Sequence, residues 1–293
     1  MIESPRHLSV LPTETIALLD PQPGEVWIDA TVGLGGHTRM IAERVGPTGR
    51  VIGLDQDQEM LTHAKSRLEG LPVTLIHANF DQLSPVLMEL DLSTVDGVLA
   101  DLGICSDQLD DAERGLSFQK DGPLDMRMDR ENGEPASALI ARMSEGALAD
   151  LIFEFGEERL SRRIARRIVE ERERSPIETT SHLSRIVRSC VPRSRDSHRI
   201  DPATRTFQAL RIAVNDELGA LDRLLKMLAR VVKPGGRAGL ISFHSLEDRR
   251  VKHTFREADI WDVKTRKPVE ASDEETARNP RARSAKLRVA VRK

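Results

Sequence analysis

The feature that most constrains the fold is a regular alternation of apolar and amphipathic segments over the first hundred residues. Short apolar runs at residues 25–30, 49–57, 73–80 and 96–103 have the character of buried strands, and helical patterns separate them. Strand, helix and strand in succession form βαβ units, whose strands lie parallel and whose helices cover the sheet. The sequence therefore predicts an α/β protein with a doubly wound, mostly parallel sheet.

The alternation breaks off in the middle of the chain. Residues 108–132 are rich in Gly, Asp and Arg without a clear period, and the helical patterns that follow are expected to end at Pro192. Residues 205–232 have the pattern of one helix, residues 237–244 that of a strand, and residues 286–293 are expected to add a last edge strand. We therefore expect a sheet domain of residues 1–112 and 205–293, and an inserted, mostly helical domain of residues 113–204.

Composition excludes several classes of protein. Hydrophobic residues make up 39% and charged residues 31% of the chain, which is typical of a globular protein. No apolar run approaches the roughly 18 residues of a membrane span, and the first residues lack the pattern of a signal peptide. We therefore expect a cytoplasmic protein without a membrane partner. The two cysteines, Cys105 and Cys190, are too few for a disulfide framework or a cysteine zinc site, so no metal is expected.

Charge is distributed in blocks, although the net charge is only −3. Residues 81–158 hold 19 acidic against 5 basic side chains, whereas residues 159–211 hold 14 arginines against 6 acids, and residues 278–293 hold 7 basic side chains and no acid. Arginine binds phosphate through two parallel hydrogen bonds, so these basic blocks favour a nucleic-acid-binding surface, although a solvated helix face has the same pattern. The candidate nucleic-acid contacts in the insertion are Arg162, Arg163, Arg166 and Arg167.

Candidate ligand-binding residues follow the ends of the predicted strands, where ligands of such sheets bind. The first strand is followed by a glycine turn, and the acid that ends the second strand, 22 positions past Gly33, is placed to accept hydrogen bonds from a ribose. A dinucleotide fingerprint would require a third glycine where Thr38 stands. This departure favours an S-adenosylmethionine site over a nicotinamide site, although a glycine turn also serves packing. These positions are Asp29, Gly33, Gly35, Gly36, Asp55, Asp57, Asn79, Phe80 and Asp101.

At this point several segments carry a family resemblance. The chain resembles the small-subunit ribosomal RNA cytosine-N4 methyltransferases, the MraW/RsmH family, from its first strand to its C-terminus. The segments that carry the resemblance are DATVGLGGHT, DLGICSDQLD, PLDMRM, DPATRTFQALRIAVNDEL, PGGRAGLISFHSLEDR and NPRARSAKLR.

The resemblance implies a Rossmann-like class I methyltransferase fold with an inserted helical domain that recognises RNA. It also implies N4-methylation, with S-adenosylmethionine as cofactor, of one cytidine in the decoding region of 16S ribosomal RNA, either as RNA or in the assembled small subunit. Carried onto this chain, the cofactor contacts of the family fall on Gly35, Gly36, His37, Asp55, Phe80, Asp101 and Gln108.

Three side chains bear on the chemistry of the site. The cytosine amine is a poor nucleophile, and Asp101 is the candidate catalytic residue that accepts one of its hydrogens, although contact with the methionine amino group fits its position equally well. His244, at the end of a predicted strand, is a candidate RNA contact or a helix cap. Cys105 stands where the family usually has serine, and N4 chemistry needs no thiolate.

Two other classes of protein remain as alternatives. One is a nicotinamide-dependent oxidoreductase, which the missing third glycine disfavours. The other is a noncatalytic RNA-binding or assembly factor that retains a nucleotide-binding fold. Neither the oligomeric state nor the substrate form can be deduced from the residues.

Overall fold

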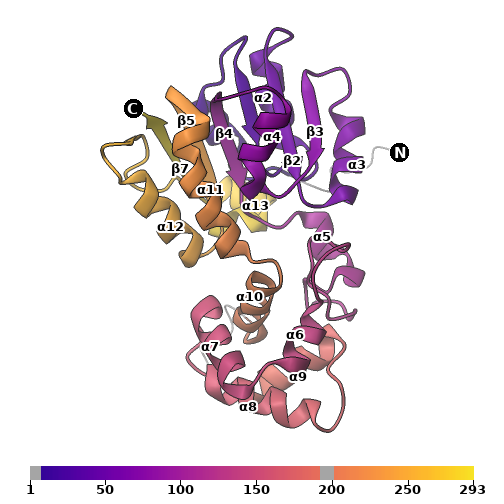
Figure 1. Ribbon diagram of the computed structural model, residues 1–293. Helices are drawn as coiled ribbons and strands as arrows, with labels where there is room; N and C mark the ends of the chain where they lie inside the picture. The colour runs from indigo at the N-terminus through magenta and orange to yellow at the C-terminus, as the bar shows by residue number, and fades with distance from the viewer. Residues whose placement is uncertain (1–7, 192–200) are drawn as a thin grey trace. The chain divides into compact units, whose positions relative to one another are not determined.

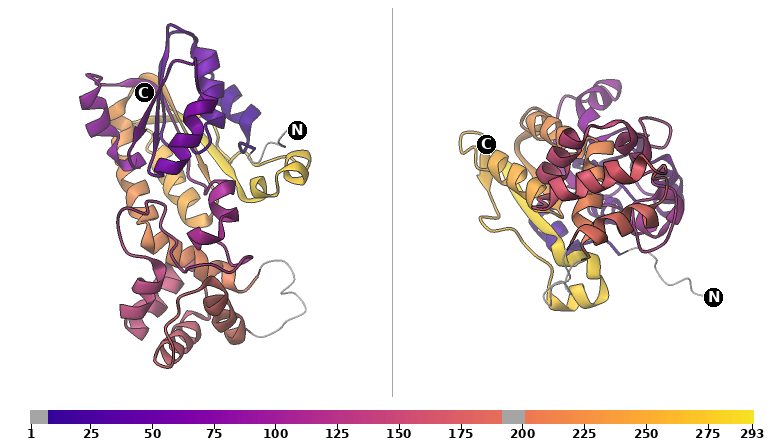
Figure 2. Two further views of the ribbon diagram at one scale, coloured as in Figure 1. Left: turned by 90° about the vertical axis from the view of Figure 1, so that its right-hand side faces the viewer. Right: turned by 90° about the horizontal axis from the view of Figure 1, so that it is seen from below.

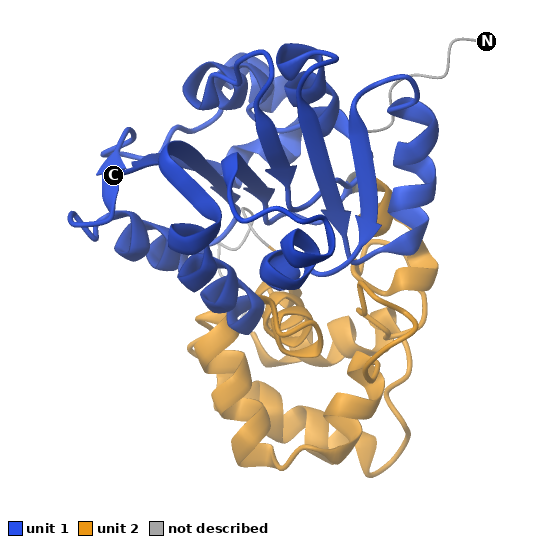
Figure 3. Cartoon of the chain, turned by 45° about the horizontal axis from the view of Figure 1, so that its top comes forward, with its two compact units in different colours: residues 1–105, 218–293 blue, residues 106–217 orange. Residues whose placement is uncertain are grey.

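The computed structural model describes residues 8–191 and 201–293, so the expected helix end at Pro192 lies outside the described residues. The chain forms two compact units (Figure 3). The first contains the chain up to Cys105 and from Leu218 onward, and the second contains residues 106–217. Each unit is described by itself below.

The first unit is built on one seven-stranded sheet, ordered β3-β2-β1-β4-β5-β7-β6. The five strands from β3 to β5 run parallel, and β7 is antiparallel to both of its neighbours. This sheet confirms the predicted doubly wound, mostly parallel fold. The strands are β1 (Val26–Asp29), β2 (Arg50–Asp55), β3 (Val73–His77), β4 (Val95–Asp101), β5 (Val232–Ser242), β6 (Trp261–Val263) and β7 (Lys286–Arg292).

Helices cover both faces of this sheet (Figures 1 and 2). On one face, Leu87, Leu224 and Val251 from three helices pack against the strands. On the other face, Trp27 of β1 and Ile41 of α2 belong to a second apolar cluster. The helical elements of this unit are α1 (Pro12–Leu19), α2 (Gly36–Val45), α3 (Gln58–Arg67), η1 (Phe80–Gln82), α4 (Leu83–Glu89), α11 (Glu217–Val231), α12 (Ser245–Phe255), α13 (Asp273–Arg278) and η3 (Pro280–Ser284).

The C-terminal strand differs from the expectation in one respect. Residues 286–293 do contain a strand, β7, but it lies inside the sheet and the edge position belongs to β6. Sequence patterns missed β6 because it has only three residues. Its Trp261 is 2% exposed and packs against Phe255, with 5.3 Å between the ring centroids. The prediction of an edge strand at the C-terminus was therefore wrong.

The second unit is mostly helical. Helix α8, for example, buries Ile164 and Ile168 on one side and exposes arginines on the other. No helix in the described part of the chain is long and apolar enough to cross a membrane. The helical elements are α5 (Ser106–Asp110), η2 (Ala112–Arg114), α6 (Ala136–Arg142), α7 (Glu145–Gly156), α8 (Ser161–Arg172), α9 (Thr180–Cys190) and α10 (Ala203–Val214).

The long helix expected at residues 205–232 is divided in two, α10 and α11. Asn215 ends α10, because its side-chain amide donates to the carbonyls of Arg211 and Met126, both at 2.8–2.9 Å. Asp216 then takes a left-handed conformation with φ of 47°. The second unit ends at this break, after Glu217, instead of at residue 204, so α10 belongs to the helical unit. The helix α5 also belongs to it, although residues up to 112 were expected in the sheet domain.

Candidate active site

Three aspartates end three neighbouring strands of the first unit. Asp29 ends β1, Asp55 ends β2 and Asp101 ends β4, and β1 lies between the other two strands. The carboxyl ends of the strands are where open α/β sheets bind their ligands. The structure therefore brings together the acids that the sequence placed at one edge.

Asp29 is buried completely and is held by two hydrogen bonds. The Thr38 hydroxyl donates to its Oδ2 at 2.6 Å, and the Thr31 amide donates to its Oδ1 at 3.2 Å. Burial raises the pKa of Asp29 to about 7, although both hydrogen bonds favour the ionised form. Thr38 stands where a dinucleotide fingerprint has its third glycine, which permits close packing of the helix on the strand, and here that position instead holds an acid.

Asp55 connects the glycine turn to the start of the next helix. Its Oδ2 accepts from the Gly33 amide at 2.7 Å, and its Oδ1 accepts from the Asp57 amide at 2.9 Å. Burial raises the pKa of Asp55 to about 6, against the effect of these two amide hydrogen bonds. Each carboxylate oxygen can accept two hydrogen bonds, so one acceptor position remains on each oxygen.

Asp101 is joined to the same turn through its backbone. Its amide donates to the Thr31 hydroxyl at 2.6 Å, and its Oδ1 accepts from the Gly103 amide at 3.3 Å. Burial and, less strongly, the charge of Glu247 together raise the pKa of Asp101 to about 7. Thr31 thus links the ends of β1 and β4.

The glycines of the turn serve different purposes. A Cβ on Gly36 would lie 1.9 Å from the Ser9 hydroxyl, and one on Gly35 would lie 3.1 Å from the Leu68 side chain. Packing therefore favours glycine at both positions, and a φ of +83° also favours it at Gly35. Nothing lies within 4 Å of the position that a Cβ on Gly33 would occupy, and its φ of +51° favours glycine. Gly33 is the glycine of this turn that leaves space for a ligand.

The remaining residues expected to bind cofactor lie in different environments. His37, near the start of α2, is 6% exposed, with its Nε2 3.0 Å from the Val10 carbonyl and its Nδ1 3.8 Å from Asp101 Oδ2. Because a carbonyl can only accept, Nε2 carries the proton. Phe80 begins η1 and packs, partly buried, against the sheet core. Gln108 is buried in α5 of the second unit.

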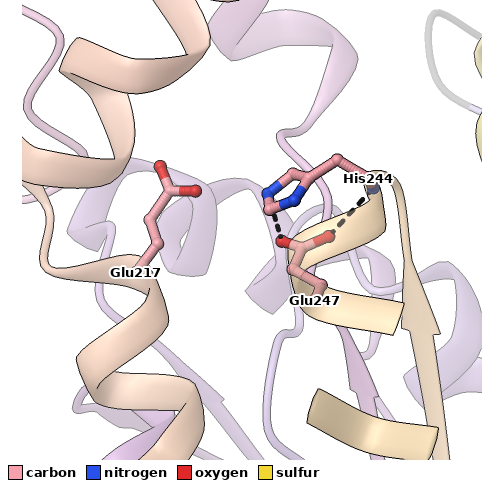
Figure 4. Close-up of side chains that lie close together, drawn as sticks. All are labelled: Glu217, His244 and Glu247. Carbon is pink, nitrogen blue, oxygen red and sulfur yellow. Dashed lines mark hydrogen bonds and ion pairs between the residues drawn. The ribbon is translucent and has the colours of Figure 1, made fainter. Parts of the chain in front are cut away.

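His244 lies at the N-terminal cap position of α12, but Glu247 caps the backbone (Figure 4). Glu247 Oε2 accepts from the amides of Phe243 and His244, at 2.8 and 3.3 Å. The His244 Nε2 lies 3.2 Å from Glu247 Oε1, and its buried Nδ1 has no hydrogen-bond partner among the described residues. The third residue drawn, Glu217, forms an ion pair with Arg211 in the second unit, at 2.6 Å.

The four arginines expected to contact RNA are all on α8, but they are not equivalent. Arg162, Arg163 and Arg166 are exposed, whereas Arg167 is partly buried. Arg167 forms ion pairs with Glu170 at 3.3 Å and Glu171 at 3.2 Å. Its charge is therefore largely neutralised by the protein itself.

Sequence reasoning missed several residues that organise this edge. Thr31 and Thr38 hold two of the aspartates, Glu247 caps α12, and Val10 contacts the His37 ring. Only Thr38 gave a signal in the sequence, because it replaces the third glycine of the dinucleotide fingerprint. The other contacts join segments far apart in the chain, which no local pattern reveals.

A doubly wound sheet with acids and a glycine turn at its strand ends defines a Rossmann-like ligand-binding protein. Residues 4–293 match the MraW methylase family. The ribosomal RNA small subunit methyltransferase H of Sorangium cellulosum is 51% identical over 289 residues, covering 98% of this chain and 91% of the relative. The protein of the same name from Acidobacterium capsulatum is 48% identical and covers 100% of both chains. The chain belongs to the MraW methylase family and is a Rossmann-like methyltransferase.

Among solved structures, TrmN from Thermus thermophilus is similar with a TM-score of 0.45 and 14% identity, covering 97% of this chain and 48% of that one. This distant likeness adds nothing to what the strand order shows.

The elevated pKa of Asp29 predicts a pH-dependent effect of Asp29→Asn. An acid whose pKa is higher in the folded than in the unfolded chain destabilises the fold as pH rises through the folded value, here about 7. Asparagine stays neutral and can still accept from Thr31 and donate to Thr38. Relative to wild type, the variant should gain roughly 2–4 kcal/mol of unfolding free energy between pH 5 and pH 8.

Urea unfolding at the two pH values measures this difference. Asp259→Asn, an exposed aspartate of the same unit, is the control and should show no such change. An Asp29→Asn variant that loses stability equally at both pH values would contradict the assignment of an ionisation cost to Asp29.

Proposed function

We propose that this protein is an S-adenosylmethionine-dependent methyltransferase of small-subunit ribosomal RNA that methylates N4 of one cytidine in the decoding region. The observation that carries the proposal is the match of residues 4–293 to a methylase family, on a chain whose sheet edge gathers three acids beside a glycine turn. The relatives that are about half identical are named for methylation of this RNA. The choice of cytidine N4 rests on the resemblance of the sequence motifs.

The residues of the sheet edge fit S-adenosylmethionine. The carboxylate of Asp55 keeps free acceptor positions for a ribose, and Gly33 leaves open space beside it. Burial leaves three acids with elevated pKa values, and a cation such as a sulfonium or an ammonium favours their ionised forms. We assign the cofactor to Gly35, Gly36, His37, Asp55, Phe80, Asp101 and Gln108.

Bound S-adenosylmethionine supplies an activated methyl group. The task of the protein is then to orient the target amine and to exclude water. Asp101 accepts a hydrogen bond from the cytosine amine, which draws electron density toward the nitrogen. A carboxyl with a pKa near 7 is suited to this exchange, because it gains and loses a proton near neutral pH.

RNA contacts are assigned to the exposed arginine face of α8 and to His244. Arginine contacts to phosphate position an RNA strand but do not select a base. The buried Nδ1 of His244 has no protein partner in the described chain, so it offers a hydrogen-bonding atom to a substrate. The target base must leave its stack to reach the cofactor, as in other enzymes that modify bases.

Two measurements test the function directly. Purified protein should transfer a tritiated methyl group from S-adenosylmethionine to small-subunit RNA or subunits, and mass spectrometry should identify the product as N4-methylcytidine. Small subunits from a strain that lacks the protein should lack this nucleoside. Binding of RNA without any transfer would favour the noncatalytic alternative.

Variants of Asp55 test the proposed contact with the ribose of the cofactor. Asp55→Ala removes the acceptor for the ribose and should weaken S-adenosylmethionine binding by about 1.5–3 kcal/mol, measured by calorimetry. It also removes the partners of the Gly33 and Asp57 amides, so the melting temperature should fall as well. Asp55→Asn keeps one acceptor oxygen, so its cofactor affinity and its melting temperature should fall less than those of Asp55→Ala. Glu59→Gln, at an exposed site in the first turn of α3, should match wild type.

Variants of Asp101 and Cys105 test which of the two side chains takes part in methyl transfer. Cys105 is buried with Leu34 and Met60, so Cys105→Ser should retain methyl transfer within a few-fold and give the same product. Asp101→Asn should abolish turnover, and the wild-type kcat/KM should fall as pH drops through about 7, because the acceptor must be ionised. A 5-methyl product, or loss of turnover in Cys105→Ser with fold and cofactor binding intact, would refute N4 chemistry.

The same variants decide between the two roles of Asp101. If Asp101→Asn loses kcat while its affinity for S-adenosylmethionine is unchanged, the carboxylate acts on the amine. If affinity falls and kcat survives, the carboxylate binds the methionine amino group.

A further inference from the structure

A surface pocket of about 230 Å³ lies between α8 and α9, entirely within the second unit. Its lining consists of Arg163, Arg166, Arg167, Glu170, Ser189 and Cys190. Three guanidinium groups therefore face one carboxylate, and the pocket carries a net positive charge. A pocket of this kind favours an anion over a neutral ligand.

The three arginines differ in how firmly the protein neutralises them. Arg167 is bound by Glu170 and Glu171, and Arg166 lies 3.6 Å from Glu145. Arg163 is exposed and has no carboxylate partner among the described residues. An anion can bind Arg163 without breaking an ion pair, so this guanidinium is the free donor of the pocket.

The thiol of the pocket does not oppose an anion. Cys190 is 2% exposed, and its Sγ lies 3.3 Å from the Ile186 carbonyl, to which it donates. Burial raises the pKa of the Cys190 thiol, so it stays protonated and uncharged. It therefore serves as a neutral wall of the pocket and not as a nucleophile.

We propose that this pocket binds one backbone phosphate of the RNA substrate, with Arg163 as the principal contact. The inference rests on the proposed function, because it takes the ligand to be RNA. The planar guanidinium of Arg163 donates two parallel hydrogen bonds to two oxygens of one phosphodiester. Arg166 and Arg167 add positive charge from the same helix. The pocket thus fixes the position of the strand and leaves base selection to other residues.

Arg163→Gln and Arg185→Gln form a matched pair for the test. Arg185 lies on α9 of the same unit, is also exposed and has no ion pair among the described residues, and it belongs neither to the pocket lining nor to the arginine face of α8. Binding of a small-subunit RNA fragment is measured by fluorescence anisotropy at several salt concentrations. Arg163→Gln should weaken binding roughly fivefold to tenfold and lower the log–log salt slope by about 0.7–0.9. Arg185→Gln should change affinity less than about twofold. Both side chains are exposed, so neither change threatens the fold.

Equal effects of the two variants, or no effect of Arg163→Gln, would overturn the proposal. Inorganic phosphate at matched ionic strength distinguishes a free anion from an RNA phosphate. It should compete no better than chloride, and specific displacement of RNA by phosphate would show that the pocket takes the free ion. Arg163→Gln should also raise KM for RNA with kcat unchanged. Absence of transfer by the wild type would refute the proposed function, whereas an unchanged KM in an active variant refutes only the pocket.

A separate set of hydrogen bonds joins the two ends of the described chain to the active-site histidine. The Val10 carbonyl lies 3.0 Å from His37 Nε2. On either side of it, the Leu11 amide donates to Glu275 Oε1 at 2.7 Å, and the Asn279 side chain donates to the Leu8 carbonyl at 3.2 Å. Glu275 belongs to α13 and Asn279 follows this helix, so both hydrogen bonds connect the region of α13 to residues 8–11.

The geometry of residues 8–11 needs this support. Leu11 has a left-handed φ of 51° although its side chain is completely buried, a conformation that costs a nonglycine residue about 1 kcal/mol or more. The Ser9 side chain fills the position that a Cβ on Gly36 would take. The segment is therefore held in one conformation against the glycine turn.

The hydrogen-bond chain points to Glu275 and Asn279 as positioning residues that orient His37 through the Val10 carbonyl. This inference also rests on the proposed function, since it takes His37 to contact S-adenosylmethionine. Residues 275–279 then have a role in cofactor binding that does not depend on the charge of the basic block at residues 278–293.

Variants of neighbouring glutamates on α13 test this role. Glu275→Ala should weaken S-adenosylmethionine binding roughly threefold to tenfold and change the NMR-measured pKa of His37. Glu275→Gln keeps a carbonyl acceptor, so its affinity for S-adenosylmethionine and its His37 pKa should match those of wild type. Glu274→Ala, which removes an exposed ion pair with Arg278, should have no effect. An unchanged His37 pKa in Glu275→Ala would overturn the role, and so would a Glu275→Gln variant as defective as Glu275→Ala. Failure of the wild type to bind S-adenosylmethionine would instead refute the proposed function.

Discussion

The active-site edge depends on burying three carboxyl groups at neighbouring strand ends. Buried carboxylates repel one another and lose hydration, so each must be held by donors from the protein. Thr38 donates to Asp29 and the Gly33 amide donates to Asp55, whereas the Thr31 hydroxyl accepts from the Asp101 amide. All three groups lie on or just after one turn. This turn therefore ties the ends of the three strands together.

The burial of these acids also bears on the proposed function. In the folded protein, burial brings the pKa values of these three acids to about 6 to 7, close to neutral pH. A cationic ligand at this edge shifts each acid toward its ionised form, and the same linkage means that ionisation favours the ligand. Under the proposed function, the desolvation of these carboxyls prepares the edge for the positive charge of S-adenosylmethionine.

Much of this arrangement could be predicted from the sequence, because its signals are local. Apolar runs ending in Asp29, Asp55 and Asp101 gave both the parallel strands and the acids at one edge. The short strand at Trp261 has too few residues for a pattern, and the helix break at Asn215 depends on contacts with the Met126 carbonyl and Met128 amide. The roles of Val10 and Glu275 depend on residues more than 260 positions apart. Such contacts arise only when the chain is folded.

The arginines of α8 show how far a charge pattern can be interpreted. Their spacing indicated one basic face, and all four do lie on one helix. Ion pairs then divide that face, because Arg167 has two glutamate partners whereas Arg163 has none among the described residues. A salt-bridged arginine must lose an existing contact to bind phosphate, and an unpaired one need not. Under the proposed function, the number of arginines on α8 therefore overstates the number of phosphate contacts, because the ion pairs decide which guanidinium groups are available.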